Sequence, residues 1–235
     1  MGGKKTTRGH VAAVVDILGH RIAAGRYTEG EVLPIEQELA DSLEVGRNAL
    51  REAVKVLSGK GLIRTAPRSG THVKPRADWN MLDPDVLRWH ADPEIATADF
   101  MLDLIEMRRI VEPKAAELAA ARATREEIAD LLSTYEAMSA PNIEQAERIE
   151  ADILFHSIIL KASHNQVLYH FRFAIATYLK AHAALGSQVS DYDDRADMER
   201  HHRLAMAIAT GKAKSAYSLT VELLKSNQSH YETKG

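Results

Sequence analysis

The chain has 235 residues, of which 45% are hydrophobic and 27% are charged, as in an ordinary soluble globular protein. No apolar run approaches the ~20 residues that a membrane-spanning helix needs, so we expect no membrane partner. The sequence has no cysteine, which excludes a disulfide scaffold, a cysteine-based zinc finger and a thiol nucleophile. A reducing cytoplasm is the expected location.

The net charge of −3 is distributed unevenly along the chain. Residues 1–77 contain 13 lysines and arginines against 8 aspartates and glutamates, whereas the remainder contains 17 against 25. Eight of the 11 histidines also lie after residue 77. A basic first third joined to an acidic, histidine-rich remainder suggests a nucleic-acid-binding module attached to a different domain.

Residues 1–77 have the pattern of a winged helix-turn-helix. Apolar residues recur at helical spacing between residues 9 and 24, and again in a short helix over 35–43. A further helix is expected over 47–60, where Leu50, Val54 and Leu57 share one face. Two short β-like pieces, 62–65 and 71–74, then flank a Pro-Arg-Ser-Gly turn and predict a hairpin.

The rest of the chain predicts helices only. Residues 78–94 contain several prolines and are interpreted as a linker with one short helix. Residues 95–235 show no strand-like alternation, and a capping signal at Thr124 and breaks at Gly186 and Gly211 separate the helices. The expected spans are 95–121, 124–138, 142–163, 166–185, 193–210 and 212–230. The prediction is therefore a mainly α protein with a C-terminal all-helical bundle.

The helix over 47–60 is the candidate DNA-reading element. The second helix of a helix-turn-helix lies in the major groove and contacts base edges with its N-terminal residues, here Arg47, Asn48 and, one turn later, Arg51. Arginine can hold guanine or phosphate through paired hydrogen bonds. Gly70 at the hairpin tip would let the backbone approach DNA closely. The alternative for each arginine alone is a solvated surface position.

The segment "GRYTEGEVLPIEQELADSLEVGRNALREAVKVLSGKGLIRTAPRSGTHV" resembles the DNA-binding domain of the GntR family of bacterial transcription regulators. The resemblance implies that Gln37, Arg47, Asn48, Arg51 and Gly70 fall where relatives touch DNA. The chain departs from the family pattern at Gly46, where a serine or threonine is usual. The departure removes a hydroxyl that could cap the recognition helix and bind phosphate.

Asp152 and His156 form an unusual pair on the helix predicted over 142–163. Their i, i+4 spacing places a carboxylate and an imidazole on the apolar face, within reach of one ion. A buried hydrogen-bonded pair is the alternative. A third ligand is sought in the adjacent His201 and His202, of which periodicity mildly prefers His201 because Leu204, Ala205 and Ile208 share its face.

Arg108 is a second charged residue on an apolar face. It shares a stripe with the apolar residues Met101, Leu104, Val111 and Ala115, so it is a candidate buried arginine that binds an anion. A structural salt bridge to Glu112 or Asp152 is the alternative. Arg109 runs on another stripe, with Glu112 at i+3.

Residues from about 95 to 231 resemble the FCD-type effector domain of the FadR branch of the GntR family. The resemblance rests on Arg108 with Glu112-Pro113, Asp152 with Phe155-His156, Asn165, and His201 with Ala207-Ile208. It implies a divalent metal ion held by Asp152, His156 and His201, and an effector bound by Arg108 and Asn165. The family's last histidine would fall at Leu223, which cannot coordinate a metal. Zinc is the first expectation, with manganese or nickel as alternatives.

These patterns together predict a ligand-responsive transcription regulator, in particular a homodimeric repressor on a pseudo-palindromic operator. A shorter resemblance of "DWNMLDPDVLRWHAD" to sugar-acid-responsive members suggests a small hydroxylated carboxylate as effector. One alternative is a metal-dependent enzyme that uses Asp152, His156 and His201. Another is an architectural DNA-binding protein without an effector.

Overall fold

The computed structural model describes residues 7–186 and 194–225, and the chain divides into two compact units, residues 1–95 and 96–235. The domain bounds expected from the sequence, 1–77, 78–94 and 95–235, stay a prediction. In the structure residues 78–94 lie within the first unit. No helix in the described part of the chain is long and apolar enough to span a membrane.

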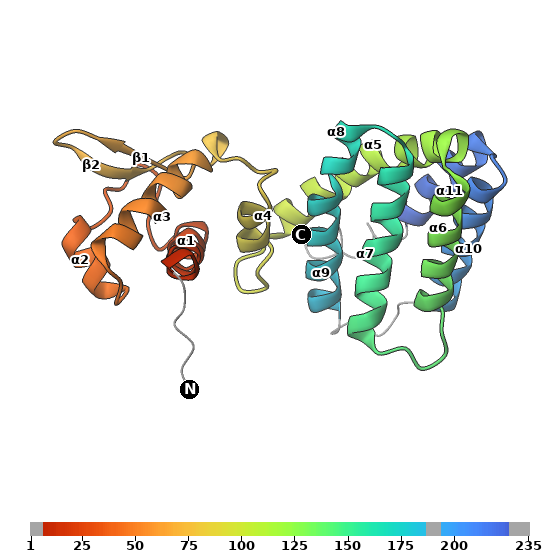
Figure 1. Ribbon diagram of the computed structural model, residues 1–235, viewed down its shortest axis with the longest axis horizontal. Coiled ribbons are helices and arrows are strands. Elements are labelled where there is room, and N and C mark those ends of the chain that lie inside the picture. The colour runs from red at the N-terminus through yellow and green to blue at the C-terminus, as the bar shows by residue number, and fades with distance from the viewer. Residues whose placement is uncertain (1–6, 187–193, 226–235) are drawn as a thin grey trace. The chain divides into compact units, whose positions relative to one another are not determined.

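The first unit is a winged helix-turn-helix, as predicted. Its elements, in chain order, are α1 (Thr7–Ala23), α2 (Glu36–Ser42), α3 (Arg47–Gly59), β1 (Ile63–Ala66), β2 (Gly70–Val73), the 3-10 helix η1 (Arg76–Asp78) and α4 (Pro84–His90). Strands β1 and β2 pair antiparallel, with Ile63 opposite Val73 and Ala66 opposite Gly70. Figure 1 shows this hairpin projecting beyond the helices.

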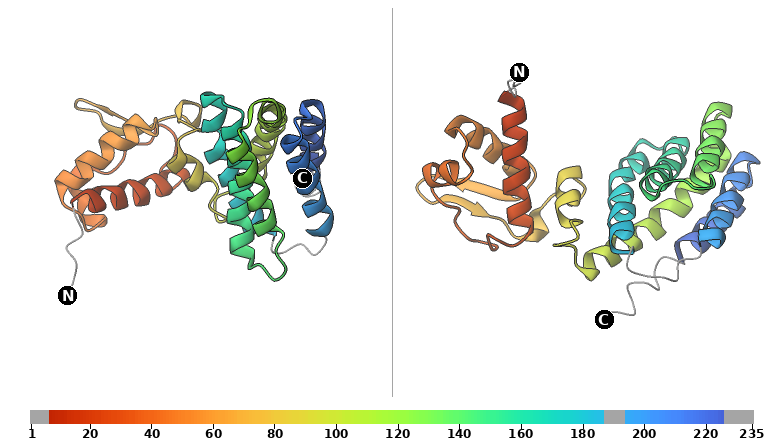
Figure 2. Two further views of the ribbon diagram at one scale, coloured as in Figure 1. Left: turned by 45° about the vertical axis from the view of Figure 1, so that its right-hand side comes forward. Right: turned by 90° about the horizontal axis from the view of Figure 1, so that it is seen from below.

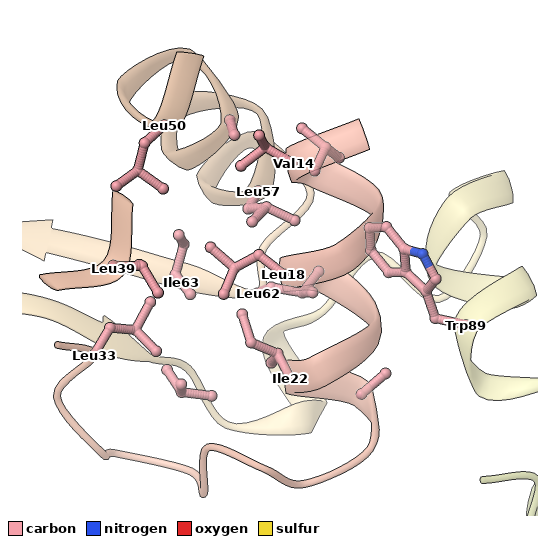
Figure 3. Close-up of a cluster of buried hydrophobic side chains, with 14 of the residues drawn as sticks. Val14, Leu18, Ile22, Leu33, Leu39, Leu50, Leu57, Leu62, Ile63 and Trp89 are labelled. Atoms are coloured by element: carbon pink, nitrogen blue, oxygen red, sulfur yellow. The ribbon is translucent and has the colours of Figure 1, made fainter. Parts of the chain in front are cut away.

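One apolar core holds these elements together. Val14, Leu18 and Ile22 recur every four residues and put one face of α1 inward, where α3 supplies Leu50 and Leu57. Figure 3 shows these side chains meeting Leu62 and Ile63 beside the hairpin. Burying each such side chain contributes about 1.5–3 kcal/mol. The shared core therefore holds α3 in a fixed orientation against α1 and the hairpin.

Helix α4 is joined to the rest of the first unit by a tryptophan and by partly buried ion pairs. Trp89 is 1% exposed and lies against α1 at Gly19, where a Cβ atom would come within 2.2 Å of its ring (Figure 3). Its indole nitrogen donates to Asp16 Oδ1 at 2.7 Å. Lys60, at the end of α3, holds Asp83 at 2.7 Å and Asp85 at 2.9 Å. The segment predicted as a linker is therefore anchored to the rest of the first unit.

The second unit is helical throughout its described residues. Its helices are α5 (Ala98–Arg122), α6 (Arg125–Met138), α7 (Gln145–Ala162), α8 (Gln166–His170), α9 (Arg172–Gly186), α10 (Asp194–Ala209) and α11 (Ala213–Lys225). Thr124 and Glu127 form the capping box that begins α6, as its sequence predicts. The last five residues of the helix expected over 212–230 lie outside the described residues.

Helix α5 is the central element of this unit. It packs against α7, α9, α10 and α11, and the right-hand view of Figure 2 shows it running between α7 and α9 on one side and α10 and α11 on the other. Small residues, including Ala115, Ala116 and Ala119, are fully buried along α5 and let its neighbours approach closely. As a result, α5, α7 and α10 each turn one face toward a common interior.

The single helix expected over 166–185 is divided in the structure. Helix α8 ends at His170, where the backbone N–H of Phe171 bonds to the carbonyl of Leu168, and α9 begins at Arg172. An i to i−3 bond of this kind tightens the last turn of a helix. The apolar periodicity of the sequence continues across this break, so the sequence pattern could not predict the break.

Candidate DNA-binding surface and metal site

The N-terminal end of α3 presents its polar side chains to solvent. Arg47, Asn48 and Arg51 are all exposed, because the core-facing stripe of this helix is Leu50, Ala53 and Leu57. The ion pair of Arg51 with Glu36 of α2 spans 2.5 Å between Nε and Oε1. The predicted recognition surface is therefore open, with one of its arginines already partnered in the free protein.

Two further residues predicted near the DNA-binding surface are Gly46, before α3, and Gln37, on α2. Gly46 is the N-cap residue of α3, has extended backbone angles, and offers no side chain to the free N–H groups of the helix. A Cβ atom there would meet nothing within 4 Å, so a serine would fit. Gln37 lies on α2 and donates through Nε2 to Asp41 at 2.7 Å.

The hairpin tip requires glycine at residue 70. Gly70 has φ +90, and a Cβ atom on it would lie 3.0 Å from a methyl group of Val32. Arg68 precedes it with φ +61, and the Ser69 hydroxyl lies 2.8 Å from Nε2 of His72. The tip is thus a tight, polar turn whose backbone stays accessible.

In the second unit the structure brings together Asp152 and His156 of α7 with His201 of α10. One ligand atom from each residue lies within 4.8 Å of the other two. Oδ1 of Asp152 is 3.3 Å from Nε2 of His156 and 3.3 Å from Nε2 of His201. Both imidazoles are 3% exposed and the Asp152 side chain is 24% exposed, so the group is reached from the Asp152 side.

The other nitrogen of each imidazole is occupied by an acceptor. His156 Nδ1 lies 2.6 Å from Oε2 of Glu112, and His201 Nδ1 lies 2.9 Å from the backbone oxygen of Asp197. Carboxylates and carbonyls only accept, so both Nδ1 atoms carry hydrogen. In the neutral imidazole, Nε2 then keeps its lone pair, which is the arrangement that a metal-bound histidine needs.

Three buried polar atoms around this group have no hydrogen-bond partner among the described residues. They are Oδ1 of Asp152, Nε2 of His201 and Nη1 of Arg108. Buried polar groups are normally satisfied, because an unpaired one costs about 1–3 kcal/mol. Two of the three, Oδ1 of Asp152 and Nε2 of His201, are atoms of the kind that bind metal ions. The residues present therefore fit a divalent cation with oxygen and nitrogen ligands.

Without an ion, the charges of the group compensate one another. Burial alone would lower the pKa of His201, but the carboxylates of Asp152 and Asp197 raise this pKa to about 10. Burial likewise opposes the charge on Asp152, yet His156 and His201 hold its pKa well below the usual range. A metal ion would replace only the Nε2 protons of the two imidazoles and leave the hydrogen on each Nδ1.

Arg108 is buried beside the three ligands. It is 1% exposed, its Nε pairs with Oε1 of Glu112, and its guanidinium lies 4.7 Å from the centre of the Tyr178 ring. The structural salt bridge to Glu112 considered from the sequence is therefore present. Among the described residues Nη1 keeps no hydrogen-bond partner, so it remains a donor that an acceptor could use. Arg109, expected to run with Glu112, is exposed.

Asn165 and Leu223 occupy structural positions. The side-chain oxygen of Asn165 accepts from the backbone N–H groups of Val167 and Leu168, so this residue caps α8. Capping accounts for the asparagine, and its predicted effector contact stays a prediction. Leu223 is 1% exposed in α11 and its hydrocarbon side chain supplies no ligand.

Other histidines of the second unit have other partners. His202 is exposed and stacks on Tyr135 with ring centroids 5.1 Å apart, which agrees with the preference for His201. His164 pairs with Glu127 at 2.9 Å, and His182 stacks on Tyr178.

Sequence reasoning missed the roles of Glu112 and Asp197. A signal for each was present. Glu112 follows Arg108 by four residues, and Asp197 precedes His201 by four, repeating the spacing of Asp152 and His156. That repeated spacing favours His201 over its neighbour more strongly than apolar periodicity does.

Both units match known families. Residues 10–73 match the bacterial regulatory proteins of the gntR family, and residues 103–226 match the FCD domain. The galactonate operon transcriptional repressor of Escherichia coli strain K12 is 37% identical over 172 residues, which cover 72% of this chain and 73% of the relative. The HTH-type transcriptional regulator YieP of the same strain is 34% identical over 212 residues, covering 89% and 90%.

The chain belongs to the GntR family. It is a transcription regulator with a GntR DNA-binding domain and an FCD domain, and the predicted branch is confirmed. The alternative reading as a metal-dependent enzyme is not supported, because these families and relatives are regulators.

Solved structures agree with this GntR fold. The structure of Lar, described as controlling expression of the Listeria monocytogenes agr system, matches with a TM-score of 0.66 and 17% identity, covering 100% of both chains. McbR/YncC of Escherichia coli matches with a TM-score of 0.54 and 18% identity, covering 96% of this chain and 98% of the other. At these identities the likeness concerns the fold alone.

Proposed function

We propose that this GntR regulator is a homodimeric repressor of an operon for sugar-acid or related carboxylate catabolism, released from its operator by a small hydroxylated carboxylate. The observation that carries the proposal is the group of Asp152, His156 and His201 beside Arg108, whose Nη1 has no hydrogen-bond partner among the described residues. Operator binding places the protein with the chromosome, in the bacterial cytoplasm.

Asp152, His156 and His201 would hold a divalent ion, with zinc first and manganese or nickel as alternatives. When bound, the ion would act as a Lewis acid that accepts oxygen ligands. Leu223 supplies no fourth ligand, and within the described residues the group has three ligands, so we expect a position open to a ligand from solution. Arg108 adds a buried guanidinium whose Nη1 has no hydrogen-bond partner among the described residues, and such a charged donor favours a carboxylate oxygen over a neutral hydroxyl as its acceptor.

A 2-hydroxy acid fits both features. Its carboxylate can accept a hydrogen bond from Nη1 of Arg108, and its oxygens suit a hard divalent ion. The relatives support this class: they include the galactonate operon repressor, the Glc operon activator and the Uxu operon regulator, all of Escherichia coli strain K12.

In the first unit, Arg47, Asn48, Arg51, Gln37 and the tip at Gly70 would contact DNA. Two copies related by a two-fold axis would read two half-sites, so a homodimer and a pseudo-palindromic operator imply each other. The effector would act by changing the relative stability of DNA-bound and free forms, which requires different affinity for the two.

The proposal is tested by screening ligands against purified protein with its operator. Sugar acids, other hydroxy acids, fatty acyl thioesters and amino acids are compared by thermal shift and by operator release, and we expect hydroxylated carboxylates to act. Arg108→Ala should keep operator binding and lose the response, whereas Arg109→Ala, its exposed neighbour, should respond normally. A long-chain lipid effector, or full response of the Arg108 variant, contradicts the proposal.

A further inference from the structure

Glu112 connects the arginine of the proposed effector site to a proposed metal ligand. Its Oε1 pairs with Nε of Arg108, and its Oε2 lies 2.6 Å from Nδ1 of His156. The residue is 3% exposed. A buried carboxylate is costly unless its oxygens are paired, and here each oxygen has its own donor.

The position of this carboxylate determines which nitrogen of His156 can bind a metal. Because a carboxylate accepts and does not donate, it keeps the hydrogen on Nδ1 and leaves the Nε2 lone pair pointing at Asp152. Nη2 of Arg108 lies 3.4 Å from the same Nε2, so the arginine is held next to the metal-ligand atom. One side chain thus orients both groups.

We infer that Glu112 is a positioning residue that sets the metal-binding nitrogen of His156 and at the same time holds Arg108 at the effector position. The inference rests on the proposed function, since it assigns Glu112 a role toward the proposed ion. This role goes beyond a structural Arg108–Glu112 ion pair, because an ion pair alone would not determine which nitrogen of His156 carries the hydrogen.

Glu112→Gln separates these two roles. A carboxamide has one accepting oxygen, and the charged guanidinium of Arg108, which can only donate, will take it. The amide NH₂ then faces His156 Nδ1, which must accept, so the imidazole hydrogen moves to Nε2, the nitrogen that the metal needs. We expect zinc affinity to fall by ~10–100-fold, the usual effect of losing such an outer partner of a metal-binding histidine.

The experiment measures zinc affinity of the full-length protein by competition with a chromophoric chelator, alongside far-ultraviolet circular dichroism and operator binding. Glu117→Gln is the matched control, because Glu117 lies on the same helix and pairs with Lys114 at 2.6 Å. We expect wild-type zinc affinity in the control and unchanged operator binding in both variants.

A folded Glu112→Gln protein with wild-type zinc affinity overturns the inference. If that variant does not fold, nitrogen-15 NMR of the zinc-loaded wild type decides instead: we expect hydrogen on Nδ1 of His156 and zinc on Nε2, and the reverse assignment overturns it. A wild type that takes up no zinc, manganese or nickel refutes the proposed metal site itself, and the inference with it.

Discussion

The two arginines at the start of α3 have unequal settings, and this difference predicts unequal losses. Arg47→Ala and Arg51→Ala should each weaken operator binding by ~1–3 kcal/mol if the lost contact reads a base. The loss should be smaller at Arg51, because that side chain must first leave Glu36, an exposed ion pair that contributes about 0–1 kcal/mol. Fluorescence anisotropy with labelled operator measures both affinities.

The salt dependence of operator binding distinguishes the kind of contact. If the lost contact is to a phosphate, the slope of log affinity against log salt concentration becomes shallower by about one unit, because one counterion fewer is released. If the lost contact is to a base, this slope stays unchanged. Arg125→Ala is the control, since Arg125 is exposed at the start of α6 in the other unit. If the Arg47→Ala and Arg51→Ala proteins both bind the operator with wild-type affinity, α3 is not part of the DNA-binding surface.

The buried imidazole of His201 predicts how pH affects the metal-free protein. Its pKa is raised from 6.5 to about 10, so the charged imidazole stabilises the fold fully below pH 6.5. This contribution is lost as pH rises from 6.5 to about 10, because a raised folded-state pKa means that the folded form binds the proton more tightly.

Zinc should reverse this trend, since metal binding needs the neutral imidazole and becomes tighter as protons leave. The free energy of unfolding, measured by urea titration between pH 6 and 9, should fall with pH in chelator-treated protein. The difference between zinc-saturated and chelator-treated protein should widen over the same range. Parallel curves for the two forms would contradict the assignment of His201 as a ligand.

At this scale the sequence singled out Asp152, His156 and His201, which the structure brings together, but not the side chains that orient them. Asp152 and His156 stand out because charge on an apolar stripe needs an explanation. Glu112 was considered only as an ion-pair partner, of Arg108 at i+4 or of Arg109 at i+3, because helical spacing gives the contacts within α5 and not those with another helix. Only packing against α7 places Glu112 beside His156.

At the scale of elements, the contact of α4 with α1 depends on one glycine. Gly19→Ala should destabilise the protein by ~1–3 kcal/mol, because its Cβ atom would lie 2.2 Å from the Trp89 ring and force the helices apart. Gly59→Ala, in α3, is the matched control, since a Cβ atom there meets nothing within 4 Å and alanine favours helix.

Urea titration followed by the fluorescence of Trp79 and Trp89 measures this effect, as both tryptophans of the chain lie in the first unit. We expect Gly59→Ala to equal or slightly exceed the wild type in free energy of unfolding. If Gly19→Ala is as stable as that control, α4 does not depend on close contact with α1.

Most of the elements follow from periodicity and capping signals, whereas tertiary contacts decide the remainder. Thr124, Gly211 and the Pro-Arg-Ser-Gly turn mark boundaries that the structure has. The break at Phe171 was not predictable, because apolar residues continue on both sides of it. The association of α4 with the first unit was also missed, since proline content suggested a linker and the fit of Trp89 against Gly19 joins residues 70 positions apart.

At the scale of the whole molecule, the proposed effector and the operator bind different units of one chain, and thermodynamics makes their influence reciprocal. If saturating effector weakens operator binding by about 100-fold, the coupling free energy is ~2.7 kcal/mol. Saturating operator must then weaken effector binding by the same factor. Isothermal titration of the effector into zinc-loaded protein, with and without a duplex carrying the operator, measures this second affinity.

Arg47→Ala is the control for this coupling, because it lies in the DNA-binding unit and leaves the residues of the helical unit unchanged. The duplex concentration is chosen to saturate the wild type while leaving the variant unbound. At this concentration, the effector affinity of the variant should equal that of DNA-free protein. The contrary outcome is that the effector releases the operator while the operator leaves the measured effector affinity unchanged. The measured effector binding and operator binding would then not be linked in the folded protein. The site around Asp152, His156 and Arg108 would then not be the place where the inducer acts.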